Sequence, residues 1–129
     1  MPTRAIGLAL AITAATGLLL AEAPATQAAP PSECRSTDFC LFSGHHQTGK
    51  VLYRLDVKVT EEGFTFPEVD DLQPLIKPLS AYNPIPNSFG CIVRLNDKPH
   101  FAGEEQEIDG FGHTELTGAP VGSITPDCG

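Results

Sequence analysis

Apolar and polar residues alternate along much of the chain with the period of two that is typical of extended strands. The clearest example is Val51–Val59, where alternate residues are apolar and the intervening residues include Arg54, Asp56 and Lys58. Six further short segments have β-type composition and are separated by Gly- or Pro-containing turns: Phe39–Ser43, Phe64–Phe66, Leu79–Tyr82, Cys91–Leu95, Glu105–Ile108 and Val121–Thr125. Several short strands at this spacing predict an all-β sandwich.

Helix is expected to be scarce. Glu68–Leu75 is the stretch that favours a helical turn. Pro74 and Pro78 prevent a longer helix, because proline lacks the backbone N–H that the helix interior requires. We therefore expect at most one turn there.

The first 29 residues have the three-part pattern of a secretory signal peptide. Arg4 gives a short positive region, Ala5–Leu20 is a mostly apolar run of 16 residues, and small residues follow it. The run is shorter than the roughly 20 residues that a membrane-spanning helix needs, and no basic cluster follows it. The pattern predicts a signal peptide over residues 1–28 and a secreted domain over residues 29–129, with cleavage within Ala23–Ala29.

The acidic charge of the chain belongs to the predicted secreted domain. The 129 residues carry 16 acidic and 8 basic side chains, which gives a net charge of −8. The predicted signal peptide holds only Arg4 and Glu22, which cancel, so the secreted domain keeps the whole net charge. Nucleic acids and anionic membrane surfaces require clustered Lys and Arg, and we therefore expect neither as a partner.

No arrangement of residues in the sequence indicates catalysis. The chain is too short for a dinucleotide-binding sheet or a barrel enzyme, and it contains neither a G-x-S-x-G nor an H-E-x-x-H motif. The acidic pairs Asp70–Asp71 and Glu104–Glu105 are adjacent residues, which point to opposite faces of a strand and so do not converge. We expect no enzymatic activity and no cofactor, and a small monomeric binding or inhibitory module instead.

All four cysteines follow the predicted signal peptide: Cys34, Cys40, Cys91 and Cys128. An even number of cysteines in a small exported domain implies two disulfides, and three pairings are open. We favour Cys34–Cys40 together with Cys91–Cys128, because the first pair suits a tight local loop and leaves the second to tie a mid-chain strand to the C-terminus.

A structural zinc site is the competing interpretation of these cysteines. The chain contains no C-x-x-C pair, and the spacings of its cysteines do not match a zinc finger. The four histidines lie in polar, Gly- or Pro-flanked stretches: His45, His46, His100 and His113. We expect them to be surface-loop residues, with no metal bound.

Two stretches of the sequence look alike and occur in the same order. Phe39–Gly49 and Cys91–Gly103 each combine a strand with a polar turn and a glycine. Each is followed, 31 or 20 residues later, by a strand centred on a serine, Ser80 or Ser123. This order resembles the Greek-key motif of the βγ-crystallins, in which a folded hairpin precedes a distant serine. The resemblance implies two Greek keys packed as an eight-strand sandwich.

In the second copy, Phe101 and Gly103 give the aromatic-x-Gly pattern of this motif. The resemblance implies a hairpin folded back over the sheet, with Gly103 in a backbone conformation that a Cβ atom disfavours. Ser123 would then form a hydrogen bond to the hairpin. Gly49 and Ser80 hold the corresponding positions in the first copy, where glutamine replaces the aromatic residue.

Many bacterial crystallin motifs bind calcium through Asn or Asp residues just before the serine strand. The corresponding stretches here, Ile76–Ser80 and Ala119–Ser123, contain no carboxylate. Because calcium takes six to eight oxygen ligands, we expect no strong calcium site.

The opening stretch Cys34–Gly44, with two cysteines followed by Leu-Phe-Ser-Gly, resembles the start of small secreted actinobacterial proteins related to the Streptomyces metalloproteinase inhibitor. The resemblance implies a signal peptide, two disulfides and a crystallin-like domain. Active members of that family block thermolysin-like zinc proteases by presenting a rigid loop to the active-site cleft. The partner expected from the resemblance is therefore an extracellular protease of the thermolysin type.

The reactive bond of that family follows a cysteine, and the nearest match in this chain is the segment Cys91, Ile92, Val93 and Arg94. Ile92 is an apolar residue of the kind that such proteases accept after the scissile bond, but the second cysteine that closes a small ring in the family is missing here. The alternative inhibitory segment is Asn83–Phe89, whose prolines lower the entropy lost on binding. Its candidate contact residues are Pro84, Ile85 and Pro86.

The competing function is that of a killer-toxin-like antifungal protein or another cell-wall-interacting secreted protein, roles known for other secreted crystallin-like domains. Such proteins are often basic, because they bind anionic cell envelopes. The net charge of −8 therefore favours inhibition over this alternative.

Overall fold

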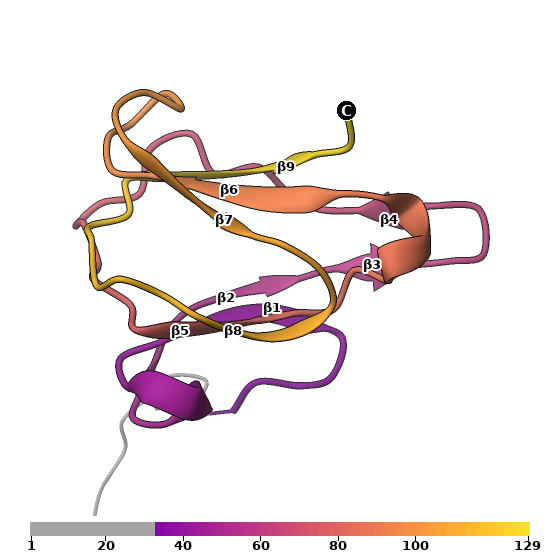
Figure 1. Ribbon diagram of the computed structural model, residues 1–129, viewed down its shortest axis with the longest axis horizontal. Coiled ribbons are helices and arrows are strands. Elements are labelled where there is room, and N and C mark those ends of the chain that lie inside the picture. The colour runs from indigo at the N-terminus through magenta and orange to yellow at the C-terminus, as the bar shows by residue number, and fades with distance from the viewer. Residues whose placement is uncertain (1–32) are drawn as a thin grey trace, which may run out of the picture. The chain divides into compact units, whose positions relative to one another are not determined.

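The computed structural model describes residues 33–129, and the predicted signal peptide and its cleavage region lie outside the described residues. The described domain consists of β-strands and two short 3-10 helices, with no α-helix among residues 33–129 (Figure 1). The strands are β1 (Asp38–Phe42), β2 (Val51–Asp56), β3 (Lys58–Val59), β4 (Phe64–Thr65), β5 (Ser80–Asn83), β6 (Ile92–Asn96), β7 (Glu105–Ile108), β8 (Gly112–Glu115) and β9 (Ser123–Asp127). The 3-10 helices are η1 (His45–Gln47) and η2 (Asn87–Phe89). No helix in this part of the chain is long and apolar enough to cross a membrane.

The strands form two antiparallel sheets and a separate two-stranded hairpin. One sheet has the order β2-β1-β5-β8, the other has the order β7-β6-β9, and β3 pairs with β4. Each half of the sequence gives a segment to the sheet of the other half, since β8 pairs with β5 and Val69 bridges to Ile124 of β9. This exchange between two consecutive units is the Greek-key arrangement of the βγ-crystallins, and it confirms the fold class predicted from the sequence.

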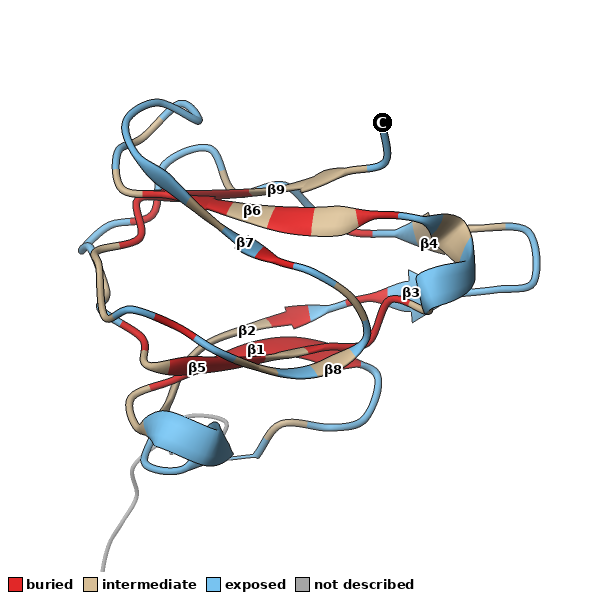
Figure 2. Cartoon of the chain, in the orientation of Figure 1, coloured by how far each residue is buried: buried red, intermediate tan, exposed pale blue. Residues whose placement is uncertain are grey.

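The two sheets enclose one hydrophobic core, and Figure 2 shows buried residues in the strands of both sheets. Phe39 and Leu41 of β1 enter it from one sheet, and Val93 and Leu95 of β6 enter it from the other, each at most 1% exposed. Phe66 packs edge-on against Phe39, with 5.2 Å between the ring centroids. On β6 the buried apolar side chains, Val93 and Leu95, fall at alternate positions, as the period of two requires.

One prediction of strand position is wrong, and one observed strand was not predicted. Val51–Val59 is not one strand, because β2 ends at Asp56 and the Val57 N–H turns to the Thr37 carbonyl (3.3 Å) while its side chain enters the core. The strand that was not predicted is β8, whose residues Gly112–Glu115 include no large apolar side chain.

The helical turn predicted over Glu68–Leu75 is absent. This segment crosses to the second sheet in an extended course, where the Val69 N–H donates to the Ile124 carbonyl (2.9 Å) and the Leu72 N–H donates to the Gly122 carbonyl (2.8 Å). Hydrogen bonds to β9 and to the residue before it satisfy backbone groups that a helical turn would otherwise satisfy internally.

In the first Greek key, a buried serine holds a hairpin that folds back over the sheet. Ser80 Oγ accepts a hydrogen bond from the Gln47 N–H (2.8 Å) and donates one to the Gly44 carbonyl (2.6 Å). His46 and Gln47 adopt the left-handed conformation, with φ of 56° and 58°, and Gly49 follows with φ of 78°. Two consecutive non-glycine residues in this region are uncommon, so the serine holds a conformation that the hairpin would not favour alone.

The second Greek key repeats this geometry. Ser123 Oγ accepts a hydrogen bond from the Phe101 N–H (3.0 Å) and donates one to the Lys98 carbonyl (2.7 Å). Phe101 and the residue before it have φ of 58° and 63°. Gly103 follows with φ of 86°, and a Cβ atom there would collide with the carboxylate of Asp97. Only glycine fits this position of the hairpin.

The disulfide pairing predicted from the sequence is confirmed. Cys34–Cys40 ties the segment before β1 to β1 itself. Cys91–Cys128 ties the residue that precedes β6 to the residue that follows β9. The second bridge therefore closes one end of the sheet to which both strands belong.

Asp38, at the start of β1, is a buried carboxylate with two arginine partners. Its side chain is fully buried, Arg35 Nε lies 3.0 Å from its Oδ2, and Arg54 Nε lies 3.6 Å from the same atom. Burial alone raises the pKa of the Asp38 carboxyl, but the hydrogen bonds from Arg35 and the charges of Arg35 and Arg54 outweigh it, so that the pKa lies below its usual value. The ionised carboxylate therefore stabilises the folded state.

We expect the free energy of unfolding to fall as the pH drops below about 4, the pKa of an aspartate in the unfolded chain. Because the pKa of Asp38 is lower in the folded state, its stabilisation is complete above this pH and is lost as the pH falls through the folded-state value. Asp38→Asn should lower the free energy of unfolding by about 1.5 kcal/mol at neutral pH and weaken the acid dependence. Urea denaturation from about pH 3 to pH 7 measures both effects. If the acid dependence of the variant equals that of the wild type, the dependence arises from other carboxylates and not from Asp38.

Candidate functional site

The first predicted inhibitory segment, Cys91–Arg94, is not a loop. Ile92–Asn96 forms β6, the central strand of its sheet, which pairs with β7 on one side and with β9 on the other. Cys91 is bonded to Cys128, and Val93 is fully buried. The prediction that this segment enters a protease cleft is wrong, because its backbone groups are already paired with two neighbouring strands.

Arg94 instead joins three acidic side chains on the outer face of this sheet. Its Nη1 contacts Glu105 and lies 2.9 Å from Glu107 Oε1, and its Nη2 lies 2.8 Å from Asp127 Oδ2. The hydrogen bond to Asp127 raises the pKa of Arg94. A hydrogen bond from the Gly129 N–H, and then the contact with Arg94, lowers the pKa of Asp127. These contacts link β6, β7 and β9, so Arg94 stabilises the sheet.

The second predicted inhibitory segment, Asn83–Phe89, turns its apolar residues inward. Pro84 and Ile85 are buried, and Ile85 is 1% exposed. The Asn83 side chain fixes this course, because its Oδ1 accepts the Ile85 N–H (3.1 Å) and its Nδ2 donates to the Gly110 carbonyl (2.9 Å). Pro84 and Ile85 thus belong to the interior, and the prediction that these two residues contact a protease is wrong, whereas Pro86 is half-buried.

The β3–β4 hairpin is the projecting element that the described domain offers instead. It is separate from the two large sheets, and Figure 1 shows its turn extending beyond the labelled strands at one end of the sandwich. Every residue from Lys58 to Glu62 is exposed. Val59, at 40% exposure, is one of four exposed large apolar side chains in the described part of the chain.

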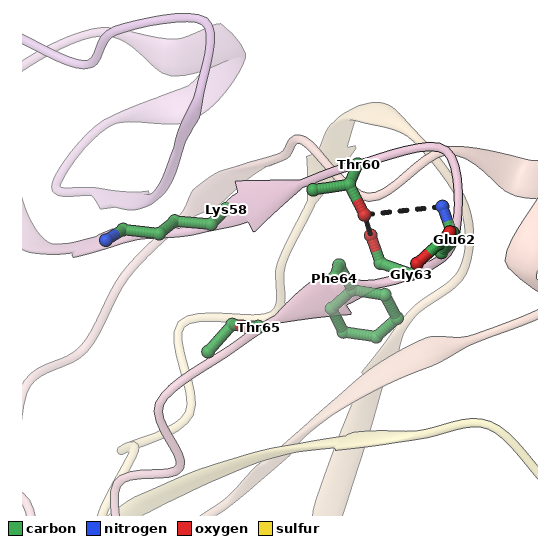
Figure 3. Close-up of a pocket in the computed structure, with 6 residues that line it drawn as sticks. All are labelled: Lys58, Thr60, Glu62, Gly63, Phe64 and Thr65. Carbon is green, nitrogen blue, oxygen red and sulfur yellow. Dashed lines mark hydrogen bonds between the residues drawn. The ribbon is translucent and has the colours of Figure 1, made fainter.

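Hydrogen bonds and an aromatic contact hold this hairpin in one shape. The Thr60 N–H donates to the Gly63 carbonyl (2.8 Å), and the Glu62 N–H donates to Thr60 Oγ1 (3.3 Å). Figure 3 shows the turn closed by the bonds that the threonine hydroxyl makes. At the base, the Phe64 and Phe89 ring centroids are 5.5 Å apart. The turn is therefore ordered before any partner binds, which lowers the entropy lost on binding.

The same hairpin lines a shallow hollow of about 370 Å³ (Figure 3). The residues that line it are Lys58, Thr60, Glu62, Gly63, Phe64 and Thr65. All of them belong to one hairpin, so the hollow has no second wall, whereas small-molecule sites are concave and mostly apolar. Its shape favours contact with a macromolecule over enclosure of a small ligand.

A second cluster lies where the first folded hairpin meets β8. The carboxylate of Glu115 lies 2.8 Å from His45 Nδ1, 2.8 Å from His113 Nε2 and 3.9 Å from His46 Nδ1. The His46 backbone N–H also donates to Glu115 Oε2 (2.9 Å), and this bond, followed by the neighbouring histidines, lowers the pKa of Glu115. The histidines are exposed, as expected, but three of the four converge on one carboxylate, and His113 lies on a strand.

Two solved structures are similar in fold to this chain. IPSE/alpha-1 from Schistosoma mansoni eggs has 13% sequence identity, and the match covers 71% of this chain and 86% of that chain with a TM-score of 0.47. A structure of IPSE alpha-1, an IgE-binding crystallin, has 14% identity, with 75% and 87% covered and a TM-score of 0.49. No known protein family and no curated protein matches the chain. The strand exchange and the two serine-held hairpins of this chain define it as crystallin-like.

Proposed function

We propose that this protein is a secreted inhibitor of an extracellular peptidase, with a thermolysin-like metalloproteinase as its target. The observation that carries the proposal is the β3–β4 hairpin, an exposed and internally hydrogen-bonded turn on a disulfide-braced sandwich. The resemblance of Cys34–Gly44 to the Streptomyces metalloproteinase inhibitor family supports the same function. Inhibition requires a preorganised surface and no chemistry of its own.

In this proposal the hairpin replaces the segments predicted from the sequence. Val59 supplies an apolar side chain for a substrate pocket of the protease, while Glu61 and Glu62 supply carboxylate oxygens, which zinc accepts as ligands. The hydrogen bonds between Thr60 and Gly63 keep the turn closed. A protease would therefore bind the hairpin without drawing it into the extended form that a substrate adopts.

Secretion is part of the proposal. Both disulfides are consistent with an oxidising compartment such as the extracellular medium, because reducing systems in the cytosol keep thiols free. The signal-peptide pattern of residues 1–28 supports the same location. We propose a monomer without enzymatic activity or cofactor, since one hairpin on one chain is sufficient for inhibition.

The activities of thermolysin and subtilisin, measured with increasing amounts of the purified protein, test this function. We expect thermolysin to lose activity in proportion to the protein added. Inhibition of subtilisin alone would support a peptidase inhibitor with a different target. Full activity of both enzymes in a large molar excess of the protein would contradict inhibition, and a zone of growth inhibition on yeast would then favour the killer-toxin-like alternative.

A further inference from the structure

We propose that His46, His113 and Glu115 form a binding site for a divalent transition-metal ion such as Zn²⁺ or Ni²⁺. One ligand atom from each residue, two imidazole nitrogens and one carboxylate oxygen, lies within 4.8 Å of the other two. Within residues 33–129, no other three His, Cys, Asp or Glu side chains converge in this way. All three are exposed, so an ion in solution can reach them directly.

The fold brings these three side chains together from two elements. His113 and Glu115 are two positions apart on β8, so they lie on the same face of the strand. His46 lies in η1 with φ of 56°, in a hairpin that is fixed by the hydrogen bond between Ser80 and Gln47. The His46 and His113 rings stack with 5.7 Å between their centroids. The site is thus built from a held hairpin against a strand.

Two imidazoles and one carboxylate are an established ligand set for zinc. Zinc binds these atoms at about 2.0–2.2 Å and takes a water in the fourth position of an open site, and imidazole also suits nickel and copper. His113 Nε2 and Glu115 Oε2 are already 2.8 Å apart, and His46 Nδ1 is 3.9 Å from the same oxygen. The His46 side chain is 79% exposed, so its ring can rotate to complete the site.

His45 supports the site from outside the ligand set. Its Nδ1 lies 2.8 Å from Glu115 Oε1, and the His46 N–H donates to Oε2. These contacts orient the carboxylate, and the remaining lone pair of Oε2 is available to an ion held with His113 Nε2. Hydrogen bonds of this kind around a ligand increase metal affinity, because they fix the direction of the donor atom.

The second Greek key provides a matched comparison. His100 occupies the position of His46 in the second hairpin, with φ of 63°, and its Nδ1 lies 3.0 Å from Asp70 Oδ2. In the described chain no third ligand residue joins this pair. The same backbone geometry therefore presents one His–Asp pair in one half of the molecule and three converging ligands in the other.

Isothermal titration of the untagged protein with ZnCl₂ and with NiCl₂ tests the site. We expect one ion per chain, with no comparable heat from CaCl₂. His46→Asn and His113→Gln should each lower the affinity at least about tenfold, because each removes a ligand. Asparagine is chosen at position 46 because it tolerates the left-handed backbone conformation. His100→Asn is the control, and it should bind both ions as tightly as the wild type.

Thermal unfolding with and without Zn²⁺ separates loss of a ligand from loss of the fold. Zn²⁺ should raise the Tm of the wild type and of His100→Asn, and should raise the Tm of His113→Gln by clearly less at the same concentration, since the stabilisation by an ion falls with its affinity for the folded state. The Tm of each variant without metal shows whether it folds. The proposal is overturned if the wild type binds neither ion at about millimolar concentration, or if folded His46→Asn and His113→Gln bind as tightly as the wild type.

Discussion

Replacing Cys91 and Cys128 together by alanine is expected to lower the free energy of unfolding by about 4 kcal/mol. The two cysteines are 37 residues apart, and their disulfide restricts a long stretch of the unfolded chain. In the folded state it lies beside the end of the β6–β9 ladder, where Ile92 pairs with Asp127. Urea denaturation of the variant and of the wild type measures the difference.

The other disulfide is the matched control for this experiment. Cys34 and Cys40 are 6 residues apart, so replacing both by alanine should lower the free energy of unfolding by about 2 kcal/mol. Both double variants lose a disulfide, and they differ chiefly in the length of chain that is released. A larger loss from the Cys34/Cys40 variant would contradict the role of Cys91–Cys128 as the main covalent restraint.

Ser80→Ala and Ser123→Ala are each expected to lower the free energy of unfolding by about 2 kcal/mol. Each hydroxyl accepts a backbone N–H and donates to a backbone carbonyl of its hairpin, and alanine leaves both groups without these partners. The control is Ser88→Ala, an exposed position in η2, which should change the value by less than about 0.5 kcal/mol. Denaturation curves in which all three variants match the wild type would contradict the account of how the hairpins are held.

Most of the sandwich could be predicted from the sequence, because alternating apolar residues and Gly or Pro turns mark where buried strands begin and end. Glu105–Ile108 was predicted at its observed bounds, and Phe39–Ser43 and Cys91–Leu95 each overlap an observed strand closely. β8 could not be predicted, because Gly112–Glu115 has no large apolar residue and is defined by its pairing with β5. That pairing depends on the long-range path of the chain.

The inhibitory segments were harder to predict, because a short apolar run looks the same in a central strand and in an exposed loop. Cys91–Arg94 is unreachable only because β7 and β9, which come later in the sequence, pair with both its edges. Asn83–Phe89 has the prolines of a stiff loop, but the Asn83 side chain turns it toward the core. The sequence shows that such a segment is stiff and which of its residues are polar, but it does not show whether its side chains point into the core or toward solvent.

The histidine cluster could not be predicted for a related reason. His46 and Glu115 are 69 residues apart, and the hydrogen bond between them forms only when the first hairpin folds against β8. The spacing of His113 and Glu115 would have placed both on one face if β8 had been recognised. The position of the β3–β4 hairpin is easier to see in the sequence than that of the histidine cluster, because the alternation of Val51–Val59 ends at a Thr-Glu-Glu-Gly turn.

Gly63 allows a direct test of the hairpin as the inhibitory element. A Cβ atom at this position would meet nothing within 4 Å, and its backbone lies outside the left-handed region, so Gly63→Arg adds bulk to the turn without straining the fold. Ala102→Arg is the matched control: it adds the same side chain at an exposed position of the second folded hairpin, at the opposite end of the view in Figure 1 from β3 and β4.

The inhibition constant of thermolysin with the wild type and these two variants is the measurement that tests the proposed function most directly. We expect the wild type and Ala102→Arg to inhibit equally, and Gly63→Arg to raise the inhibition constant at least about a hundredfold, as the loss of a central contact would. Equal inhibition by all three proteins would show that the hairpin is not the inhibitory element. Full thermolysin activity with the wild type in large molar excess would contradict the function itself.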